Sequence, residues 1–137
     1  MAVTSGRPRF RLGSALVSTV ESVKTVLEAF DAYASKDFDR LAELYAEQVT
    51  WCCRHEPGPW DCLNRDDVLG MFRARMRRDV KRTADQILVV GHRVLVRGHT
   101  DAARFVDVYT VEDGRIVEIQ THPTTDAGLN ALKSKSA

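Results

Sequence analysis

The chain has 137 residues, of which 44% are hydrophobic and 28% are charged, and these values are ordinary for a globular domain. They exclude a disordered chain, a collagen-like fibre and a membrane-spanning bundle. Twenty Lys and Arg residues face 19 Asp and Glu residues, so the formal charge of +1 provides no global field for nucleic acid or an anionic membrane. Three cysteines make neither a disulfide framework nor a zinc motif, which favours the cytoplasm as the location.

The N-terminal segment, residues 1–17, carries Arg7, Arg9 and Arg11 and no acidic residue. Its apolar run is too short and too polar for a signal peptide. We expect a flexible basic arm, with a transit peptide as the alternative. A single domain would then span residues 18–123.

Two helices are predicted at the start of this domain. Ser18 and Glu21 have the spacing of a capping box, and apolar residues then recur at intervals of three and four, which predicts an amphipathic helix over residues 19–35. Asp37 can cap a second, shorter helix. Its apolar face would consist of Phe38, Leu41, Leu44 and Tyr45. A strand is predicted over residues 49–55, before a loop that contains two prolines.

A third helix is predicted to begin at Asn64, a favourable N-cap with Asp67 three residues later. Its apolar positions are Val68, Leu69, Phe72, Met76 and Val80. Its basic residues are Arg73, Arg75, Arg77, Arg78, Lys81 and Arg82. On a helical projection the two sets fall on opposite sides, so we interpret the basic set as a solvated face. Nucleic-acid binding through this face is the alternative, and we expect no nucleic-acid partner.

Only strands are predicted after this helix. They cover residues 84–90, 93–99, 103–111 and 115–121. Gly91-His92 and Asp113-Gly114 mark tight turns between them. Residues 124–137 are expected to form a polar C-terminal tail. The order of helices followed by a meander predicts an α+β fold, with the helices on one side of the sheet.

Three stretches resemble a known superfamily. They are Leu44-Tyr45-Ala46-Glu47 at the end of the helix pair, Asn64-Arg65-Asp66-Asp67-Val68 at the third helix, and the segment from Phe105 to Val117, which ends in Glu112-Asp113-Gly114-Arg115-Ile116-Val117. Together with the element order they resemble the nuclear transport factor 2 (NTF2)-like fold over about residues 20–123, in the branch of SnoaL-like polyketide cyclases and ketosteroid isomerases. The resemblance implies a cone in which three N-terminal helices pack on a strongly curved mixed or antiparallel sheet and enclose a pocket.

The resemblance also implies a homodimer in many members. On the strand over residues 103–111, Phe105, Asp107 and Tyr109 occupy one face, while Val106 and Val108 occupy the other. Both faces therefore look buried. Because a monomer would leave the outer face polar, we predict a homodimer that buries Val106 and Val108.

Asp107 is the first candidate catalytic residue. In ketosteroid isomerases an Asp at this position of the strand stays protonated and hydrogen-bonds a developing oxyanion, and the resemblance implies this role for Asp107. The alternative is an Asp that faces solvent or pairs with an Arg such as Arg97. The general-base Asp of these isomerases falls on Cys53 here and their oxyanion Tyr falls near Ala29, so a steroid isomerase is not expected.

His55 is the second candidate catalytic residue. On a regular strand it shares one face with Trp51 and Cys53, and its ordinary pKa suits proton transfer near neutral pH. An imidazole at the mouth of the pocket could act as the base, whereas a histidine that opens a Pro-containing loop could equally be exposed.

The expected pocket is apolar, and its candidate lining residues are Phe30, Tyr33, Trp51, Cys53, Trp60, Phe105, Tyr109 and Ile119. Ordinary core packing is the alternative for each of them, and Trp60 could form a lid or pack against the third helix. His92, His99 and His122 have no metal-ligand spacing, and no phosphate or dinucleotide motif follows a strand. We therefore expect no metal and no cofactor.

These features lead to two hypotheses about function. The first is cofactor-independent acid/base catalysis on a small, largely apolar organic molecule, of the cyclase, isomerase or dehydratase kind. The alternative is a module of the same fold that binds a ligand or forms a dimer without catalysis. An enzyme needs at least two titratable groups that converge on one cavity.

Overall fold

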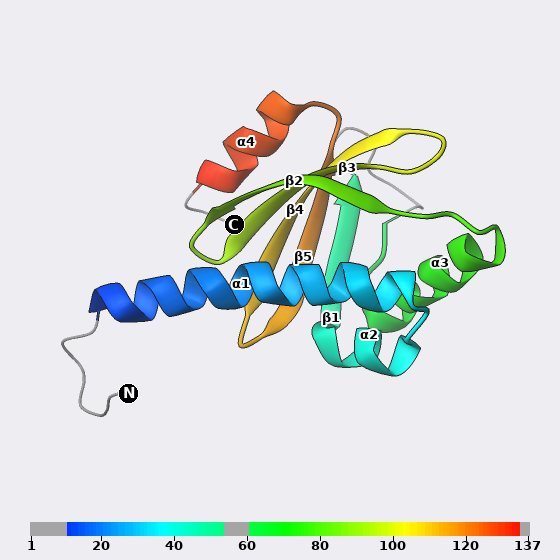
Figure 1. The fold of residues 1–137 in the computed structure, drawn as a ribbon, viewed down its shortest axis with the longest axis horizontal. Coiled ribbons are helices and arrows are strands. Elements are labelled where there is room, and N and C mark those ends of the chain that lie inside the picture. Colours follow the sequence, from blue (N-terminus) through cyan, green and yellow to red (C-terminus); the bar gives the residue numbers. More distant parts are fainter. Residues whose placement is uncertain (1–10, 54–60, 135–137) are drawn as a thin grey trace.

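The computed structural model describes residues 11–53 and 61–134, with side chains from residue 19 onward apart from that of Cys53. Its elements are α1 (Arg11–Ala34), α2 (Phe38–Leu44), β1 (Tyr45–Cys53), α3 (Arg65–Arg77), β2 (Thr83–Val90), β3 (Arg93–His99), β4 (Arg104–Glu112), β5 (Arg115–His122) and α4 (Thr125–Lys133). The strands form one sheet in the order β1-β5-β4-β3-β2 (Figure 1). β1 and β5 are parallel and the other neighbours are antiparallel, so the predicted α+β fold with a mixed sheet is confirmed.

Local sequence signals determine several of the element ends. The side chains of Asp37 and Asn64 each accept a hydrogen bond from the backbone N–H three residues later, at 3.0 and 2.9 Å, and these caps start α2 and α3. The turn between β2 and β3 contains Gly91 at φ +60°, and the turn between β4 and β5 contains Asp113 and Gly114 at φ +52° and +74°. These left-handed conformations are those that tight hairpin turns require.

Two helix ends differ from the sequence prediction. α1 begins at Arg11 rather than near residue 19. α3 ends at Arg77, whereas its apolar periodicity suggested a continuation to Val80. Asp79, at φ +55°, takes the chain out of the helix, so the residues that follow no longer obey helical spacing.

The main core lies between the inner face of the sheet and the first three helices. Its fully buried members include Val26, Leu41, Val49, Phe72, Val94, Val96, Tyr109 and Ile119. The alternation along the strands places Asp107 and Tyr109 of β4 on this inner face, opposite Val96 and Val94 of β3.

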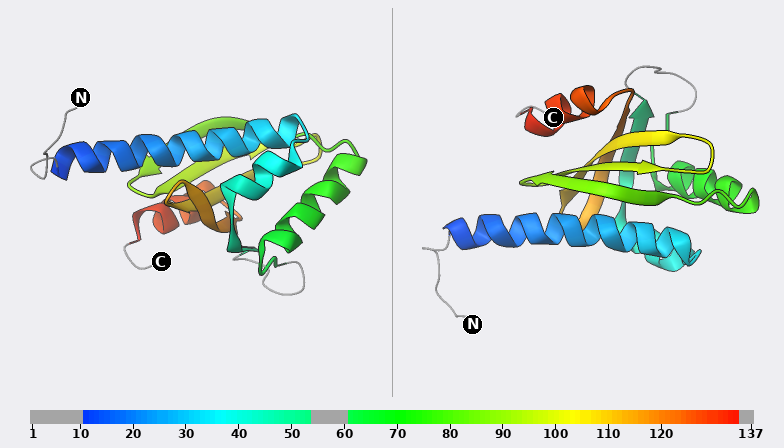
Figure 2. Two further views of the ribbon diagram at one scale, coloured as in Figure 1. Left: turned by 90° about the horizontal axis from the view of Figure 1, so that it is seen from below. Right: turned by 45° about the horizontal axis from the view of Figure 1, so that its top comes forward.

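The C-terminal segment forms a helix that the sequence analysis did not predict. Thr124 caps α4, and the helix packs on the side of the sheet away from α1, as Figure 2 shows. Leu132 of α4 contacts Leu95 and Val108. At Gly128 the helix comes so close to the sheet that a Cβ atom would lie 2.6 Å from the side chain of Val106.

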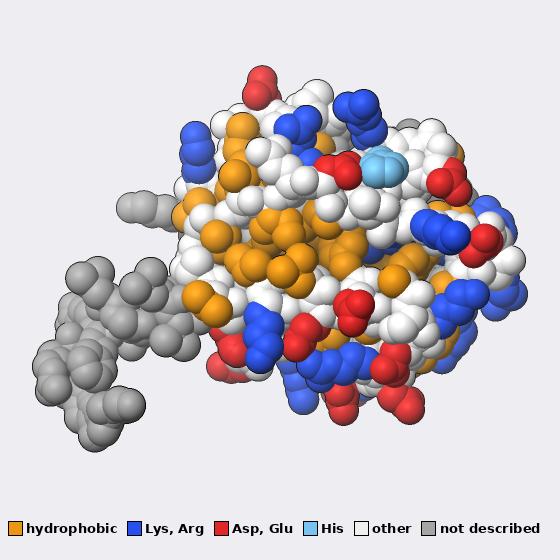
Figure 3. All heavy atoms as spheres, viewed as in Figure 1, with side chains coloured by type: hydrophobic (Ala, Val, Ile, Leu, Met, Phe, Trp, Pro, Cys, Tyr) orange, Lys and Arg blue, Asp and Glu red, His pale blue; other side chains and the backbone are white. Residues whose placement is uncertain are grey.

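This helix changes the argument for a dimer. Val108 is 3% exposed because α4 covers it within the same chain, so burial of both faces of β4 does not require a second copy. The large apolar side chains that gather on the opposite side lie between α1 and β2 (Figure 3). Val20 and Leu27 of α1 are exposed. Leu88 and Val90 of β2 are exposed too, but their partners Leu95 and Arg93 place them on the face of the sheet that α4 covers. Within the described residues, no helix is both long and apolar enough to cross a membrane.

Candidate functional site

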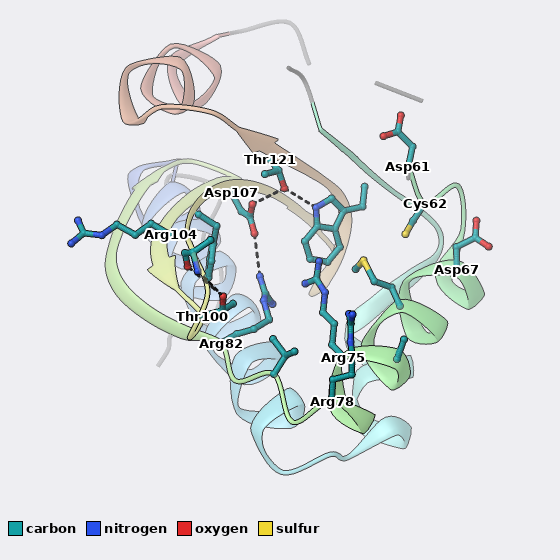
Figure 4. A pocket seen from close by; sticks show the side chains of 16 residues that line it. Asp61, Cys62, Asp67, Arg75, Arg78, Arg82, Thr100, Arg104, Asp107 and Thr121 are labelled. Carbon is teal, nitrogen blue, oxygen red and sulfur yellow. Dashed lines mark hydrogen bonds and ion pairs between the residues drawn. The ribbon is translucent and has the colours of Figure 1, made fainter. Parts of the chain in front are cut away.

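A cavity of about 690 Å³ opens between α3 and the inner face of the sheet (Figure 4). Its apolar lining comprises Trp51, Met71, Ala74, Val80, Ala103 and Phe105. Its charged lining comprises Asp61, Asp67, Arg75, Arg78, Arg82, Arg104 and Asp107. Charged side chains therefore stand beside the apolar surface that the sequence predicted for this pocket.

A buried ion pair between Arg82 and Asp107 forms one wall of this cavity. Nη2 of Arg82 donates a hydrogen bond to Oδ2 of Asp107 at 3.1 Å, and the two side chains are 3% and 2% exposed. The hydroxyl of Thr121 on β5 donates to the other carboxylate oxygen at 2.7 Å. The indole N–H of Trp51 in turn donates to the Thr121 oxygen at 2.9 Å, so one chain of donors leads to Asp107.

Aromatic rings surround the guanidinium of Arg82. Its Cζ atom lies 4.8–5.8 Å from the ring centroids of Phe30, Tyr33, Trp51, Phe72 and Phe105. Arg82 also donates to the hydroxyl of Tyr109 at 3.4 Å. Ring faces attract a cation, and a planar guanidinium can stack on them, so the cage stabilises the charge that burial would otherwise disfavour.

The pKa values of this pair follow from burial and from mutual attraction. Burial raises the pKa of the Asp107 carboxyl, whereas the charge of Arg82 and the hydrogen bond from Thr121 act to lower it. Burial would lower the pKa of Arg82, but Tyr109 and Asp107 outweigh it and hold that pKa above its usual range. Arg82 therefore remains a cation, and the two donors that point at Asp107 suit an ionised carboxylate.

The structure places six of the eight candidate lining residues, in three groups. Trp51 and Phe105 line the cavity. Phe30, Tyr33 and Tyr109 lie behind them in the cage around Arg82. Ile119 is fully buried in the core. The side chain of Cys53 lies outside the described residues, as do all atoms of Trp60 and of the candidate base His55.

The interpretation of the basic residues of α3 as a solvated face is wrong for two of them. Arg82 lies beyond the end of the helix and turns inward to Asp107, and Arg75 lines the cavity. The earlier end of α3 is the physical reason, since a helical projection does not apply after Asp79. One signal could have found Arg82: a carboxylate predicted on a buried face requires a cation partner.

Arg97, the partner considered for Asp107, lies on the other face of the sheet. It is exposed and donates to Gln86 Oε1 at 2.8 Å. His99 pairs with Asp85 at 2.7 Å on the surface, and neither His92 nor His122 lines the cavity. Among the described side chains, no group of three or more His, Cys, Asp or Glu could hold a metal ion.

The comparison with family models identifies the domain. The model of the SnoaL-like domain matches residues 26–119. The chain belongs to the SnoaL-like domain family. The family resemblance stated from the sequence is thereby confirmed, and the matched region extends from α1 to β5 and includes every element that builds the cavity.

Solved structures show the same NTF2-like fold for this SnoaL-like chain. A candidate polyketide cyclase from Streptomyces antibioticus has a TM-score of 0.64 at 21% identity, over 81% of this chain and 96% of its own. A candidate ketosteroid isomerase from Kribbella flavida has a TM-score of 0.62 at 20% identity, over 77% of this chain and 78% of its own. An LEH-like epoxide hydrolase from M. tuberculosis has a TM-score of 0.61 at 18% identity, over 83% of this chain and 90% of its own. The search of curated proteins found no significant match.

Proposed function

We propose that this SnoaL-like protein catalyses a cofactor-independent acid/base reaction on a small organic molecule bound in the cavity, of the isomerase, cyclase or dehydratase kind. The observation that carries the proposal is the carboxylate of Asp107, which lines the cavity, is almost fully buried and is oriented by Arg82 and Thr121. The arginines that neighbour Asp107 at the cavity stay protonated, so they would stabilise negative charge, and a second titratable group beside Asp107 stays a prediction. Structural neighbours named as a polyketide cyclase and a ketosteroid isomerase candidate support the same reaction class.

Asp107 would act as the proton acceptor rather than as a protonated donor. Each of its oxygens accepts one hydrogen bond, and a carboxylate has further lone pairs that can accept a proton. When a C–H bond next to a substrate carbonyl breaks, the proton passes to Asp107 and the electron pair moves onto the carbonyl oxygen. The new oxyanion then takes the place of the carboxylate as counter-ion of the guanidiniums, so the net charge of the cavity stays constant.

His55 remains a second candidate for the base. It lies outside the described residues, and the strand register supports it as a candidate. Homodimer formation and a cytoplasmic location also stay predictions, and light scattering of the native protein tests the first of them.

A non-catalytic ligand-binding module is the alternative. The observation that favours it is that both oxygens of Asp107 already accept hydrogen bonds, so the donors Arg82 and Thr121 oppose the rise in its pKa that burial causes.

Proton exchange distinguishes the two functions without knowledge of the natural substrate. The probe is 2-tetralone, whose protons next to the carbonyl exchange with D₂O once a base removes them, and NMR measures the rate. We expect the wild-type protein to accelerate the exchange and Asp107→Asn to slow it by about 10²- to 10⁴-fold, the usual size of a general-base effect. Asp85→Asn is the matched control, since Asp85 lies on the surface in a pair with His99.

Each other outcome has a definite meaning. Binding of 2-tetralone without any acceleration of exchange favours the binding module. If His55→Ala abolishes the exchange and Asp107→Asn does not, His55 is the base and Asp107 only holds Arg82.

A further inference from the structure

Arg75 provides the second guanidinium at the cavity and is not part of the ion pair between Arg82 and Asp107. It projects from α3, and its Cζ atom lies 5.9 Å from the centroid of the Trp51 ring. Arg82, by contrast, is matched by Asp107. Within residues 19–52 and 61–134, no carboxylate lies within ion-pair distance of Arg75.

The other acidic residues of the cavity do not balance Arg75. Asp67 lies eight residues earlier on α3, about 12 Å along the helix axis, and its Oδ2 accepts the backbone N–H of Leu63. Asp61 points away from Arg75 in Figure 4. Among the residues that the structure describes, the inner cavity therefore holds two guanidiniums and one carboxylate, which leaves one positive charge without a counter-ion from this set.

The surroundings of Arg75 make this charge unfavourable when the cavity is empty. Burial lowers the pKa of Arg75, and the positive charge of Arg82 lowers it further. A bound anion would relieve both effects, because it would replace the lost hydration and screen the two cations from each other.

We infer that the ligand of this cavity carries a carboxylate that binds Arg75, on an apolar and largely flat body. This inference rests on the proposed function, since it concerns the same cavity. The fork of a guanidinium matches the two oxygens of a carboxylate, and a single negative charge balances the single unmatched positive charge. The ring of Trp51 on β1, the side chain of Met71 on α3 and the ring of Phe105 on β4 provide apolar surface for the body.

Arg78 assists at the entrance. It is exposed, lines the same cavity one turn beyond Arg75, and both side chains extend towards the sheet in Figure 4. An exposed cation contributes to the attraction of an anion more than to its final affinity. Arg75 is therefore the residue that determines specificity for the acid.

The experiment compares an acid with its neutral isostere. Isothermal titration calorimetry at pH 7 measures the binding of 2-naphthoate and of 2-naphthamide to the wild-type protein, to Arg75→Gln and to Arg77→Gln. Arg77 is an exposed arginine on the same helix that does not line the cavity, so Arg77→Gln is the matched control. We expect 2-naphthoate to bind at least about 10-fold more tightly than the amide. In Arg75→Gln the affinity for 2-naphthoate should fall about 10- to 100-fold, while the affinity for the amide stays within about twofold.

Four results would overturn the inference. The first is equal affinity of the wild-type protein for the acid and the amide, and the second is binding of neither. The third is a preference for the acid that survives in Arg75→Gln. Inorganic phosphate that displaces 2-naphthoate as readily as benzoate does would also contradict a carboxylate site. The proposed function is judged separately, because 2-tetralone is neutral and its exchange by Asp107 requires no carboxylate on the ligand.

Discussion

The Arg82–Asp107 pair gives the sharpest prediction about stability. The side chains of Arg82 and Asp107 are 3% and 2% exposed. Asp107→Asn leaves the buried guanidinium without its counter-ion inside the aromatic cage, and Arg82→Met leaves the buried carboxylate without its cation. Removal of one partner of a buried pair costs about 3–5 kcal/mol, whereas replacement of both by neutral groups costs much less. We therefore expect each single variant to lose about 4 kcal/mol of unfolding free energy. The double variant should lose only about 1 kcal/mol, far less than the sum of the two single losses, because it buries no charge without a partner.

Urea denaturation followed by circular dichroism measures these differences. With a denaturant slope of about 2 kcal/mol per molar for a small domain, each single variant should unfold at a urea concentration lower by about 2 M. The control is the surface pair of Arg40 with Glu28, which is shorter at 2.7 Å but has side chains 41% and 36% exposed. Arg40→Gln should lower the urea midpoint far less than either single variant of the buried pair, because solvent screens an exposed pair.

The comparison tests burial rather than distance, since the buried pair is the longer of the two. Losses for Asp107→Asn as small as that of Arg40→Gln would refute the reasoning. So would two single losses that simply add in the double variant, because independent groups have no coupling energy.

Two further predictions follow from the same region. Burial raises the pKa of Tyr109 from its ordinary 10.0 to about 12, so the wild-type protein should keep its full stability below pH 10 and lose about 3 kcal/mol as the pH rises to 12. Urea titrations at pH 9 and 11.5 measure the unfolding free energy of the wild-type protein and of Tyr109→Phe, and the decrease between these pH values should be smaller in Tyr109→Phe. An equal decrease in both proteins would contradict the raised pKa of Tyr109. At Gly98, a Cβ atom would lie 2.2 Å from the carbonyl oxygen of Thr83 and 2.5 Å from the ring of Phe105. Gly98→Ala should therefore cost about 1–3 kcal/mol in a thermal melt and weaken 2-naphthamide binding by displacing Phe105, and unchanged values would exclude this tight contact.

The parts of the fold that the sequence predicted are those with local causes. The caps at Asp37 and Asn64 and the turn at Asp113-Gly114 depend on a few adjacent residues, and each lies where it was expected. Helix α4 was missed because its apolar content is small and its partners, Leu95 and Val108, lie on strands far away in the sequence. Its local signals are the cap at Thr124, Asp126 in the first turn and Lys133 in the last.

The sequence predicted the candidate site mainly from the strand that carries Asp107, and the structure adds Arg82 and Thr121 from other parts of the chain. Alternation along β4 was sufficient to place Asp107 beside Phe105 and Tyr109, because side chains two residues apart share a face of a strand. Arg82 could not be found in this way, since its environment combines residues from α1, β1, α3 and β4 that meet only in the folded chain. The end of α3 at Arg77 was the decisive local detail, because it releases Arg82 from the helical projection.

Stability and function impose opposite requirements on this wall of the cavity. A neutral pair in place of Arg82 and Asp107 would avoid the desolvation of two charges, and the double variant should recover most of the stability that either single variant loses. The same double variant has neither the carboxylate that accepts a proton nor the guanidinium that meets the oxyanion, so it should be folded and without proton exchange on 2-tetralone. A folded, stable and inactive double variant would show that the buried charges serve the reaction rather than the fold. Exchange at the wild-type rate in that variant would instead place the chemistry away from Asp107.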